Sequence, residues 1–313
     1  MTKAATPDSA QHPFRGTSLS HRLSVCAALL ALSLVFAIAA LVIYWIFVQT
    51  RPGQALDEAA LKGAEIGRDI LIGAAETVLN IVSVVFLIIA IIVVGVFAVG
   101  RKRYGLAIAA MALVVGANVS TQVMKHALER PEYGVSTINF NSLPSGHTTV
   151  AASVAAALIL VVPRQFRILT VLLAGGYATA TGIATLSAGW HRPADVITAL
   201  LVVAAWTALV SALVQLRHPV VDDPSQATAQ ALSPPAKAVV WVLVVAGLLT
   251  LCVAFVLMYQ TQAGAAPLNT TDQLLVAYGG GTAGIAGVAA LVFALALALA
   301  PIAARTPWVQ ASK

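Results

Sequence analysis

Residues 139–162 read NFNSLPSGHTTVAASVAAALILVV, a polar stretch that leads directly into an apolar run. The polar part ends in Pro144-Ser-Gly-His147, and the apolar part extends from there to Val162. A small hydroxyl residue, a glycine and a histidine at a loop-to-helix junction offer one anion backbone N–H groups, a side-chain donor and a titratable group. This stretch therefore predicts half of a phosphate site at the end of an apolar helix.

The composition excludes an ordinary water-soluble domain. Hydrophobic residues make up 59% of the 313 residues and charged residues only 10%, and the mean hydropathy is +0.91. Apolar runs of about 20 residues, the length that crosses roughly 30 Å of hydrocarbon as a helix, recur along the chain. Because no alternating pattern suggests a β-barrel, the predicted fold class is all-α, a polytopic helical membrane bundle.

Eight apolar runs divide the chain. The first six form a predicted core over 23–216, preceded by a cytoplasmic tail at 1–22. A polar, Pro-rich cytoplasmic linker at 217–237 follows, and two additional spans with a short tail occupy 238–313. The expected spans cover residues 23–48, 77–100, 104–124, 146–162, 168–186, 194–216, 238–259 and 274–300.

The segment 55–66 has a pattern different from that of the spans. It reads ALDEAALKGAEI, in which apolar and charged positions alternate at helical spacing. This pattern predicts an amphipathic helix that lies on the outer surface of the membrane. Such a helix is in a position to cover a lipid entrance, although the simpler interpretation is a helix that rests on the surface with no gating role.

The charge distribution predicts the orientation of the spans. An even number of spans places both termini on one side, and the tails and loops of that side hold 12 of the 18 lysines and arginines. The positive-inside rule then predicts cytoplasmic termini in a plasma membrane, and explains the basic balance of +6 without a nucleic-acid partner. The loop before His147 and the turn that contains His191 both fall on the extracytoplasmic face. The Ala- and Val-rich composition and the short loops favour a bacterial source.

Two further groups of residues on that face can complete a phosphate site. Lys125 and Arg130 follow the third span, where cations beside lipid are costly and tend to be functional, although both can also snorkel to headgroups. His191 and Asp195 stand four residues apart at the start of the sixth span. On a helix they share a face, so the carboxylate can bind one imidazole nitrogen and leave the other as a nucleophile. With His147, these groups provide charge neutralisation, a nucleophile and an acid.

The three motifs, taken in order, resemble those of the type 2 phosphatidic acid phosphatase superfamily. The resemblance covers roughly 77–216, so the last two spans lie outside it. The ordered set is more specific than any single motif. Its members are Lys125-x4-Arg130-Pro131, Pro144-Ser-Gly-His147 and His191-x3-Asp195.

The resemblance implies a role for each matching residue. His191 is expected to attack phosphorus and form a phosphohistidine, while Asp195 holds its tautomer. His147 is expected to protonate the leaving alkoxide and then to activate water. Enzymes of this family use no metal and no cofactor. The residues implied to bind the phosphoryl oxygens are Lys125, Arg130, Ser145 and Gly146.

Two motifs depart from the family pattern. The first usually has six residues between its lysine and the Arg-Pro pair, whereas here there are four, and the usual arginine position holds Glu132. The third usually opens with Ser-Arg, and here those positions are Ala184 and Thr185. Glu132 and Arg192 are therefore two further candidates for the site. Arg192 either replaces the missing arginine or anchors the headgroup layer, since as the neighbour of His191 it points about 100° away on a helix.

The sequence thus predicts an integral membrane hydrolase of lipid metabolism in the cell envelope. It is expected to remove phosphate from a lipid phosphate or diphosphate in the bilayer, such as phosphatidic acid, phosphatidylglycerol phosphate or a polyprenyl diphosphate. A lipid phosphotransferase with an alcohol acceptor and a non-catalytic protein that binds or transports anionic lipid remain as alternatives. A metal site is a weaker alternative, because the two cations would repel a metal ion. Its ligands would be His147, His191, Asp195 and Glu132.

Overall fold

The structure is a computed structural model that describes residues 19–81, 104–136, 140–216, 232–263 and 270–303, and only positions 92, 95 and 96 between 81 and 104. Throughout these residues the regular structure is helical, with no strand, which confirms the predicted all-α class. Six helices in the described part of the chain are long and apolar enough to cross a membrane. The chain is therefore a multi-pass membrane protein.

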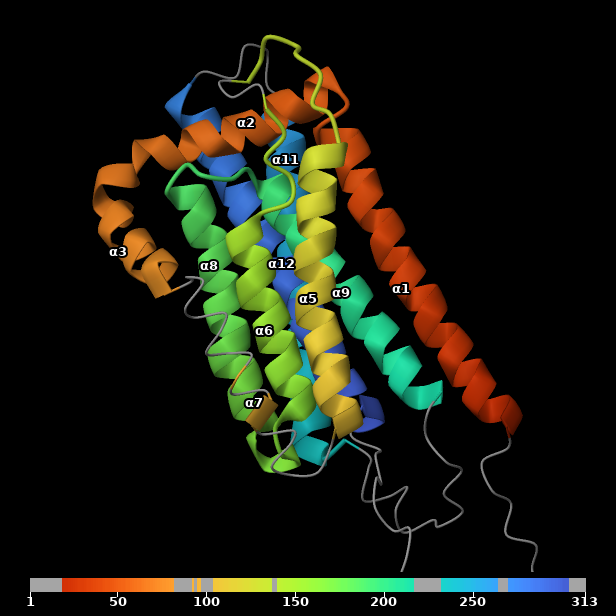
Figure 1. The fold of residues 1–313 in the computed structure, drawn as a ribbon. Coiled ribbons are helices and arrows are strands. Elements are labelled where there is room, and N and C mark those ends of the chain that lie inside the picture. The colour runs from red at the N-terminus through yellow and green to blue at the C-terminus, as the bar shows by residue number, and fades with distance from the viewer. Residues whose placement is uncertain are drawn as a thin grey trace, which may run out of the picture.

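The long helices run side by side along the bundle (Figure 1). They begin and end within a few residues of the predicted spans, because each continuous apolar run is bounded by polar or Pro-containing segments. The predicted span 77–100 lies largely outside the described residues, as does most of the linker at 217–237. The long helices are α1 (Leu19–Phe47), α5 (Tyr104–Ala127), α9 (Pro193–Leu216), α11 (Pro234–Ala263) and α12 (Thr271–Ala303).

The fourth and fifth predicted spans form shorter helical pieces. The polar stretch leads into α6 (Gly146–Val161), as its pattern predicts. The fifth span contains a π-helical turn, and a 3₁₀ turn precedes it. Its pieces are η1 (Arg164–Phe166), α7 (Arg167–Thr170), η2 (Val171–Gly175) and α8 (Gly176–Ser187).

The amphipathic segment forms α2 (Arg51–Ile66), which lies across one end of the bundle and is followed by α3 (Arg68–Ile81) (Figure 1). Thr50 caps α2 by accepting a hydrogen bond from the backbone N–H of Gly53 at 3.1 Å. The helix packs against α12, α1 and α9, and Gly63 lies against the backbone of Leu274, with no room for a Cβ atom. The prediction of a helix resting on the membrane surface is therefore wrong in one respect. Its buried face, which contains Asp57 and Glu58 as well as small and apolar residues, packs against the protein's own helices.

The last helix, α12, lies inside the bundle and packs against α2, α6, α8 and α9 as well as α11. Small residues allow this close approach. Gly281 lies against Pro193 at the start of α9, with a Cβ position only 2.6 Å from the proline ring. The Tyr278 hydroxyl is 2.8 Å from the Ser187 hydroxyl at the end of α8. The C-terminal part of the chain thus supports both helices that flank the turn containing His191.

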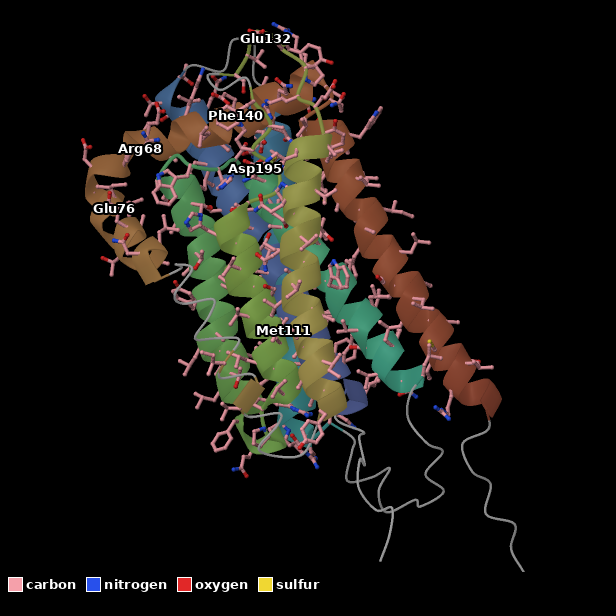
Figure 2. The ribbon with its side chains drawn as sticks, in the orientation of Figure 1. Arg68, Glu76, Met111, Glu132, Phe140 and Asp195 are labelled. Atoms are coloured by element: carbon pink, nitrogen blue, oxygen red, sulfur yellow. The ribbon has the colours of Figure 1, made fainter. Side chains whose placement is uncertain are left out.

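The predicted motifs lie at one end of the bundle, the end that α2 covers. Glu132, Phe140 and Arg68 lie at this end, with Asp195 just beneath, whereas Met111 lies midway along the helices (Figure 2). The described start of α1 and the end of α12 lie at the opposite end (Figure 1). Loops that are far apart in the sequence can therefore contribute to one site.

Candidate active site

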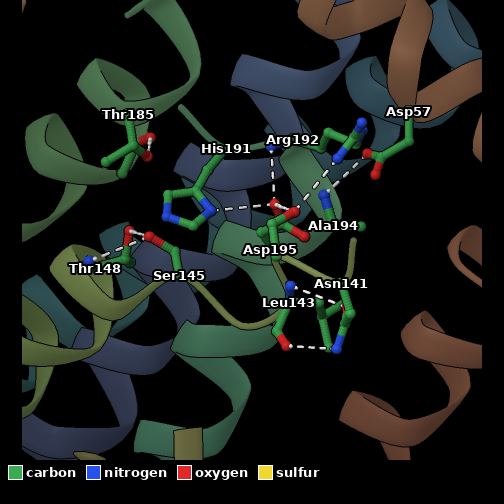
Figure 3. A network of polar contacts seen from close by, with 12 residues as sticks. Asp57, Asn141, Leu143, Ser145, Thr148, Thr185, His191, Arg192, Ala194 and Asp195 are labelled. Atoms are coloured by element: carbon green, nitrogen blue, oxygen red, sulfur yellow. Dashed lines mark hydrogen bonds and ion pairs between the residues drawn. The ribbon is translucent and has the colours of Figure 1, made fainter. Parts of the chain in front are cut away.

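The structure brings His191 and Asp195 together. The Nδ1 atom of His191 lies 3.1 Å from Oδ2 of Asp195 (Figure 3). His191 precedes α9 rather than lying on it, because the helix begins at Pro193. Asp195 reaches back to this turn and also accepts the backbone N–H of Arg192 at 3.1 Å, as the third residue of a helix does in a capping box. A carboxylate can only accept, so Nδ1 carries the proton and Nε2 is left with its lone pair.

A glycine shapes the turn that leads to His191. Gly189 has φ +78°, a conformation that residues with a Cβ atom rarely adopt. A Cβ atom there would also collide with the guanidinium of Arg68, which comes from the start of α3. The carbonyl of Thr185 accepts the N–H groups of Trp190 and His191 at 2.9 and 3.1 Å. The turn is therefore held by backbone contacts from α8 and by packing from α3.

Asp195 also connects the turn to the polar stretch before α6. Its Oδ2 atom accepts a hydrogen bond from the Ser142 hydroxyl at 2.7 Å, and its backbone carbonyl accepts the N–H of Ser145 at 2.9 Å. Asp195 is buried, and its Oδ1 atom has no hydrogen-bond partner within the described ranges. The second and third motifs thus meet at Asp195, through its backbone carbonyl and the N–H of Ser145.

Ser145 and His147 occupy the start of α6. The hydroxyl of Ser145 caps the helix by accepting from the backbone N–H and the hydroxyl of Thr148, at 3.4 and 3.1 Å. Nothing lies within 4 Å of the position that a Cβ atom on Gly146 would take. The ring of the half-buried His147 lies 5.4 Å from that of Trp190, and His147 is within electrostatic range of His191 and Lys125. The two histidines and the lysine therefore share one neighbourhood.

Arg130 is buried, with 9% of its surface exposed. It lies within electrostatic range of Arg192, Asp57 and Asp195. It donates to the Ser136 hydroxyl at 3.0 Å, while its Nε and Nη1 atoms have no hydrogen-bond partner among the residues described. Burial, followed by the charge of Arg192, lowers the pKa of Arg130. A buried guanidinium cannot serve as a headgroup anchor, so the snorkelling alternative does not fit Arg130.

Arg192 turns inward and is only 1% exposed. Its Nε and Nη2 atoms each lie 2.8 Å from Oε2 of Glu58 on α2. The guanidinium also donates to the hydroxyls of Ser136 and Ser142, at 2.8 and 3.3 Å. The interpretation of Arg192 as an interfacial anchor is therefore wrong, and most of its donors are used within the protein.

The two positions at which the family usually has an arginine, Glu132 and Thr185, contribute no positive charge to the site. Glu132 is exposed and lies at the outermost end of the molecule (Figure 2). Thr185 is buried, and its hydroxyl donates to the carbonyl of Gly182 at 2.7 Å. Thr185 thus supports the turn through its backbone and does not replace the charge of an arginine.

The residues that sequence reasoning missed come from α2 and from the loop before α6. They are Asp57, Glu58, Ser136 and Ser142. The two acids do have a signal in the sequence, because each lies about one helical turn from the apolar Ala60 or Leu61. In the structure both acids, Gln54 and these two apolar residues are buried. Carboxylates on the same stripe as apolar residues indicate a face that packs against protein and meets partners there.

Asp57 is held at the start of α9. Its Oδ1 atom accepts the backbone N–H of Ala194 at 3.0 Å, and its Oδ2 atom has no hydrogen-bond partner in the described part of the chain (Figure 3). Burial, followed by the charge of Asp195, raises the pKa of Asp57 from its ordinary value of 3.8 to about 7. Its contribution to folding stability is therefore fully present below pH 3.8 and is lost as the pH rises to about 7.

Asp57→Asn should remove this pH dependence. The amide keeps the acceptor for Ala194 and stays neutral, so the variant is expected to be more stable than the wild type at pH 8. The gain is of the order of a few kcal/mol, since one pKa unit corresponds to about 1.4 kcal/mol. Thermal unfolding in detergent between pH 4 and pH 8 measures the difference. The exposed Asp69, changed to Asn, is the matched control, and identical pH profiles for wild type and Asp57→Asn would contradict this account.

The comparisons with known proteins identify the family. Residues 23–219 match the family described as the PAP2 superfamily. No curated protein and no solved structure matches the chain. The matched range contains all three predicted motifs and ends just after α9, so that α11 and α12 lie outside it. Because this range covers more than half of the chain, the protein belongs to the PAP2 superfamily, a family of membrane phosphatases.

Proposed function

We propose that the protein hydrolyses the phosphate of a membrane lipid phosphate or diphosphate through a phosphohistidine on His191. One observation carries the proposal. The Nδ1 atom of His191 is 3.1 Å from a buried carboxylate that can only accept, so its Nε2 atom can act as the nucleophile. Membership in a family of membrane phosphatases supports the hydrolysis of a lipid phosphate in general.

In the first step, Nε2 of His191 forms a bond to phosphorus and the bond between phosphorus and the lipid oxygen breaks. Asp195 accepts from Nδ1–H and stabilises the positive charge that the phosphorylated imidazole acquires. His147 donates a proton to the departing alkoxide, so the lipid leaves as a neutral alcohol. For a diphosphate, the lipid monophosphate leaves in the same way.

In the second step, the now neutral His147 takes a proton from water. The water oxygen attacks phosphorus and the bond between nitrogen and phosphorus breaks, which releases inorganic phosphate and regenerates His191. The proton that His147 gives to the alkoxide is returned to it by the attacking water, so the two steps together consume one water and leave both histidines as they began.

The phosphoryl oxygens are proposed to bind to Arg130, Lys125 and the backbone at Gly146. Arg130 is the strongest candidate, because its Nε and Nη1 atoms have no hydrogen-bond partner within the described residues and lie in a buried position. Ser145 contributes by ordering the start of α6, since its hydroxyl already caps the helix. Arg192, most of whose donors are used by Glu58 and two serines, is assigned no contact with phosphate.

The substrate is proposed to be presented at the extracytoplasmic face of a bacterial plasma membrane. The support is the excess of lysine and arginine in the loops and tails at the opposite end. An enzyme at this face acts on lipids of the outer leaflet, consistent with a role in the cell envelope.

A panel of lipid phosphates tests the function. Purified protein in detergent is given phosphatidic acid, phosphatidylglycerol phosphate and a polyprenyl diphosphate, each labelled in the terminal phosphate. We expect inorganic phosphate to be released from at least one of them in the presence of chelator. Label that appears in a second lipid when an alcohol acceptor is added indicates a phosphotransferase. Binding without release and without acid-labile label on the protein would overturn the enzymatic proposal.

A further inference from the structure

We propose that Glu58, on the helix that covers the site, is a positioning residue for the His191–Asp195 pair and acts through Arg192. The kinetic consequence of this inference rests on the proposed function. Neither Glu58 nor Arg192 belongs to the three motifs.

The contact between Glu58 and Arg192 is buried and charge-assisted. Both distances to Oε2 of Glu58, from Nε and from Nη2 of Arg192, are 2.8 Å. The side chains are 2% and 1% exposed, respectively. Ser136 donates to the same carboxylate oxygen at 3.0 Å. A buried pair of this kind tolerates the loss of one partner poorly, because the remaining charge is left without compensation.

The contacts of Arg192 extend from this pair to the catalytic histidine by two routes. Through its side chain, Arg192 donates to the Ser142 hydroxyl at 3.3 Å, and Ser142 donates to Oδ2 of Asp195 at 2.7 Å. Through its backbone, Arg192 donates to the same oxygen at 3.1 Å. His191 is the next residue in the chain and shares that acceptor. The position of Arg192 therefore determines how Asp195 faces His191 (Figure 3).

Glu58 also holds the guanidinium of Arg192 away from the carboxylate of Asp195. Arg130 and Arg192 both donate to the Ser136 hydroxyl, so two guanidinium groups lie close together beside one carboxylate. Without Glu58, Arg192 would be repelled by Arg130 and attracted to the remaining buried acids, Asp57 and Asp195. The Oδ1 atom of Asp195 has no hydrogen-bond partner among the described residues, so it is an available target. A guanidinium bound there would compete with His191 for the carboxylate.

The first test is Glu58→Gln, which keeps the shape and removes the charge. We expect kcat for the best lipid phosphate to fall about 10- to 100-fold. Residues that orient metal ligands in metalloenzymes have effects of this size, and Glu58 would orient a catalytic side chain in the same way. KM should change little, because Glu58 does not contact the substrate. Glu65→Gln is the matched control, since Glu65 is on the same helix but its side chain is 60% exposed and pairs only loosely with Arg68 at 3.6 Å. A fall in kcat shared by both variants, or by neither, would overturn the proposal.

The second test combines Glu58→Gln with Arg192→Gln. If Glu58 acts through Arg192, kcat of the double variant should be about equal to that of Arg192→Gln alone. Multiplication of the two single effects would show that Glu58 acts on the reaction independently, and would contradict the proposed route.

The third test does not depend on any substrate. Hydrogen exchange of the peptide that covers 188–196 should become about 10-fold faster in Glu58→Gln and remain unchanged in Glu65→Gln. The reason is that a displaced Arg192 no longer holds its backbone N–H against Oδ2 of Asp195. Faster exchange in Glu58→Gln, when the wild-type protein releases no phosphate, would reject the proposed function but retain the positioning role. Unchanged exchange in Glu58→Gln would reject the positioning role whatever the activity. If Glu58→Gln does not fold, Glu58→Asp keeps the charge and is expected to show the same effects at smaller size.

Discussion

His191→Ala should reduce phosphate release from the lipid substrate by at least about 10³-fold, because it removes the atom that attacks phosphorus. The same change should abolish the acid-labile phosphate that the wild-type protein carries when it is quenched during turnover with labelled substrate. Asp195 and Ser142 keep their mutual hydrogen bond without the imidazole, so the fold is expected to survive. Rapid quench with alkali-stable trapping of the phosphoprotein measures both effects.

The control for this experiment is a second histidine outside the pair. His126 is exposed in the last turn of α5, and its Nδ1 atom lies 2.7 Å from the carbonyl oxygen of Gln122. His126→Ala should leave both phosphate release and the trapped phosphoprotein unchanged. If His191→Ala instead retains activity and label, the nucleophile has been assigned to the wrong residue and the phosphohistidine mechanism fails at this position.

His147→Ala should lower phosphate release from a lipid phosphate by about 10²- to 10⁴-fold, the usual contribution of a general acid–base group. The loss should depend on the leaving group. With p-nitrophenyl phosphate the departing phenolate needs no proton, so His191 can still be phosphorylated. The second step still lacks its base. A burst of p-nitrophenol followed by slow turnover, with phosphoprotein accumulating, is therefore expected.

The burst separates a catalytic role of His147 from a structural one. If His147 only packed against Trp190, whose ring lies 5.4 Å away, its removal would slow both substrates alike and leave no accumulated intermediate. Trp190→Leu is a useful companion because it removes the neighbouring ring and keeps the imidazole. Equal losses for His147→Ala and Trp190→Leu on both substrates would argue against acid–base catalysis by His147.

The spans were predictable from the sequence because lipid imposes a simple rule. A helix that crosses hydrocarbon needs a long apolar run, and the ends of such a run are visible as charged or Pro-containing segments. Thus α5 begins at Tyr104 directly after Arg101-Lys-Arg103, and α9 begins at Pro193. The three motifs were also visible, since their residues lie at the ends of these runs.

The partners of buried polar residues were not predictable in the same way. The direction of Arg192 was inferred from a helix that includes His191, but the helix begins one residue after Arg192, so that inference had no basis. Its true partner, Glu58, lies 134 positions earlier in the chain. Which of several acids a buried arginine meets depends on how helices pack, and one sequence contains no measure of that packing.

The contribution of α12 was equally hidden. The resemblance to the family covered roughly 77–216, the second to the sixth predicted spans, and the matched range ends at residue 219. Packing nonetheless places Gly281 against Pro193, at the start of the helix that contains Asp195. The motifs contain the residues proposed for the chemistry, whereas α12 supports the turn through the small Gly281 and the hydroxyl of Tyr278.

The two acids of α2 have a consequence for how a lipid reaches the site. To lift this helix from the bundle would expose Glu58 and Asp57 and leave Arg192 and the start of α9 without them. A buried charge that loses its partner costs about 3–5 kcal/mol, so we expect α2 to stay on the bundle as long as Arg192 stays buried. We thus expect α2 to cover the site permanently and not to open during turnover. We therefore expect a lipid substrate to enter between the membrane-spanning helices, in the plane of the bilayer.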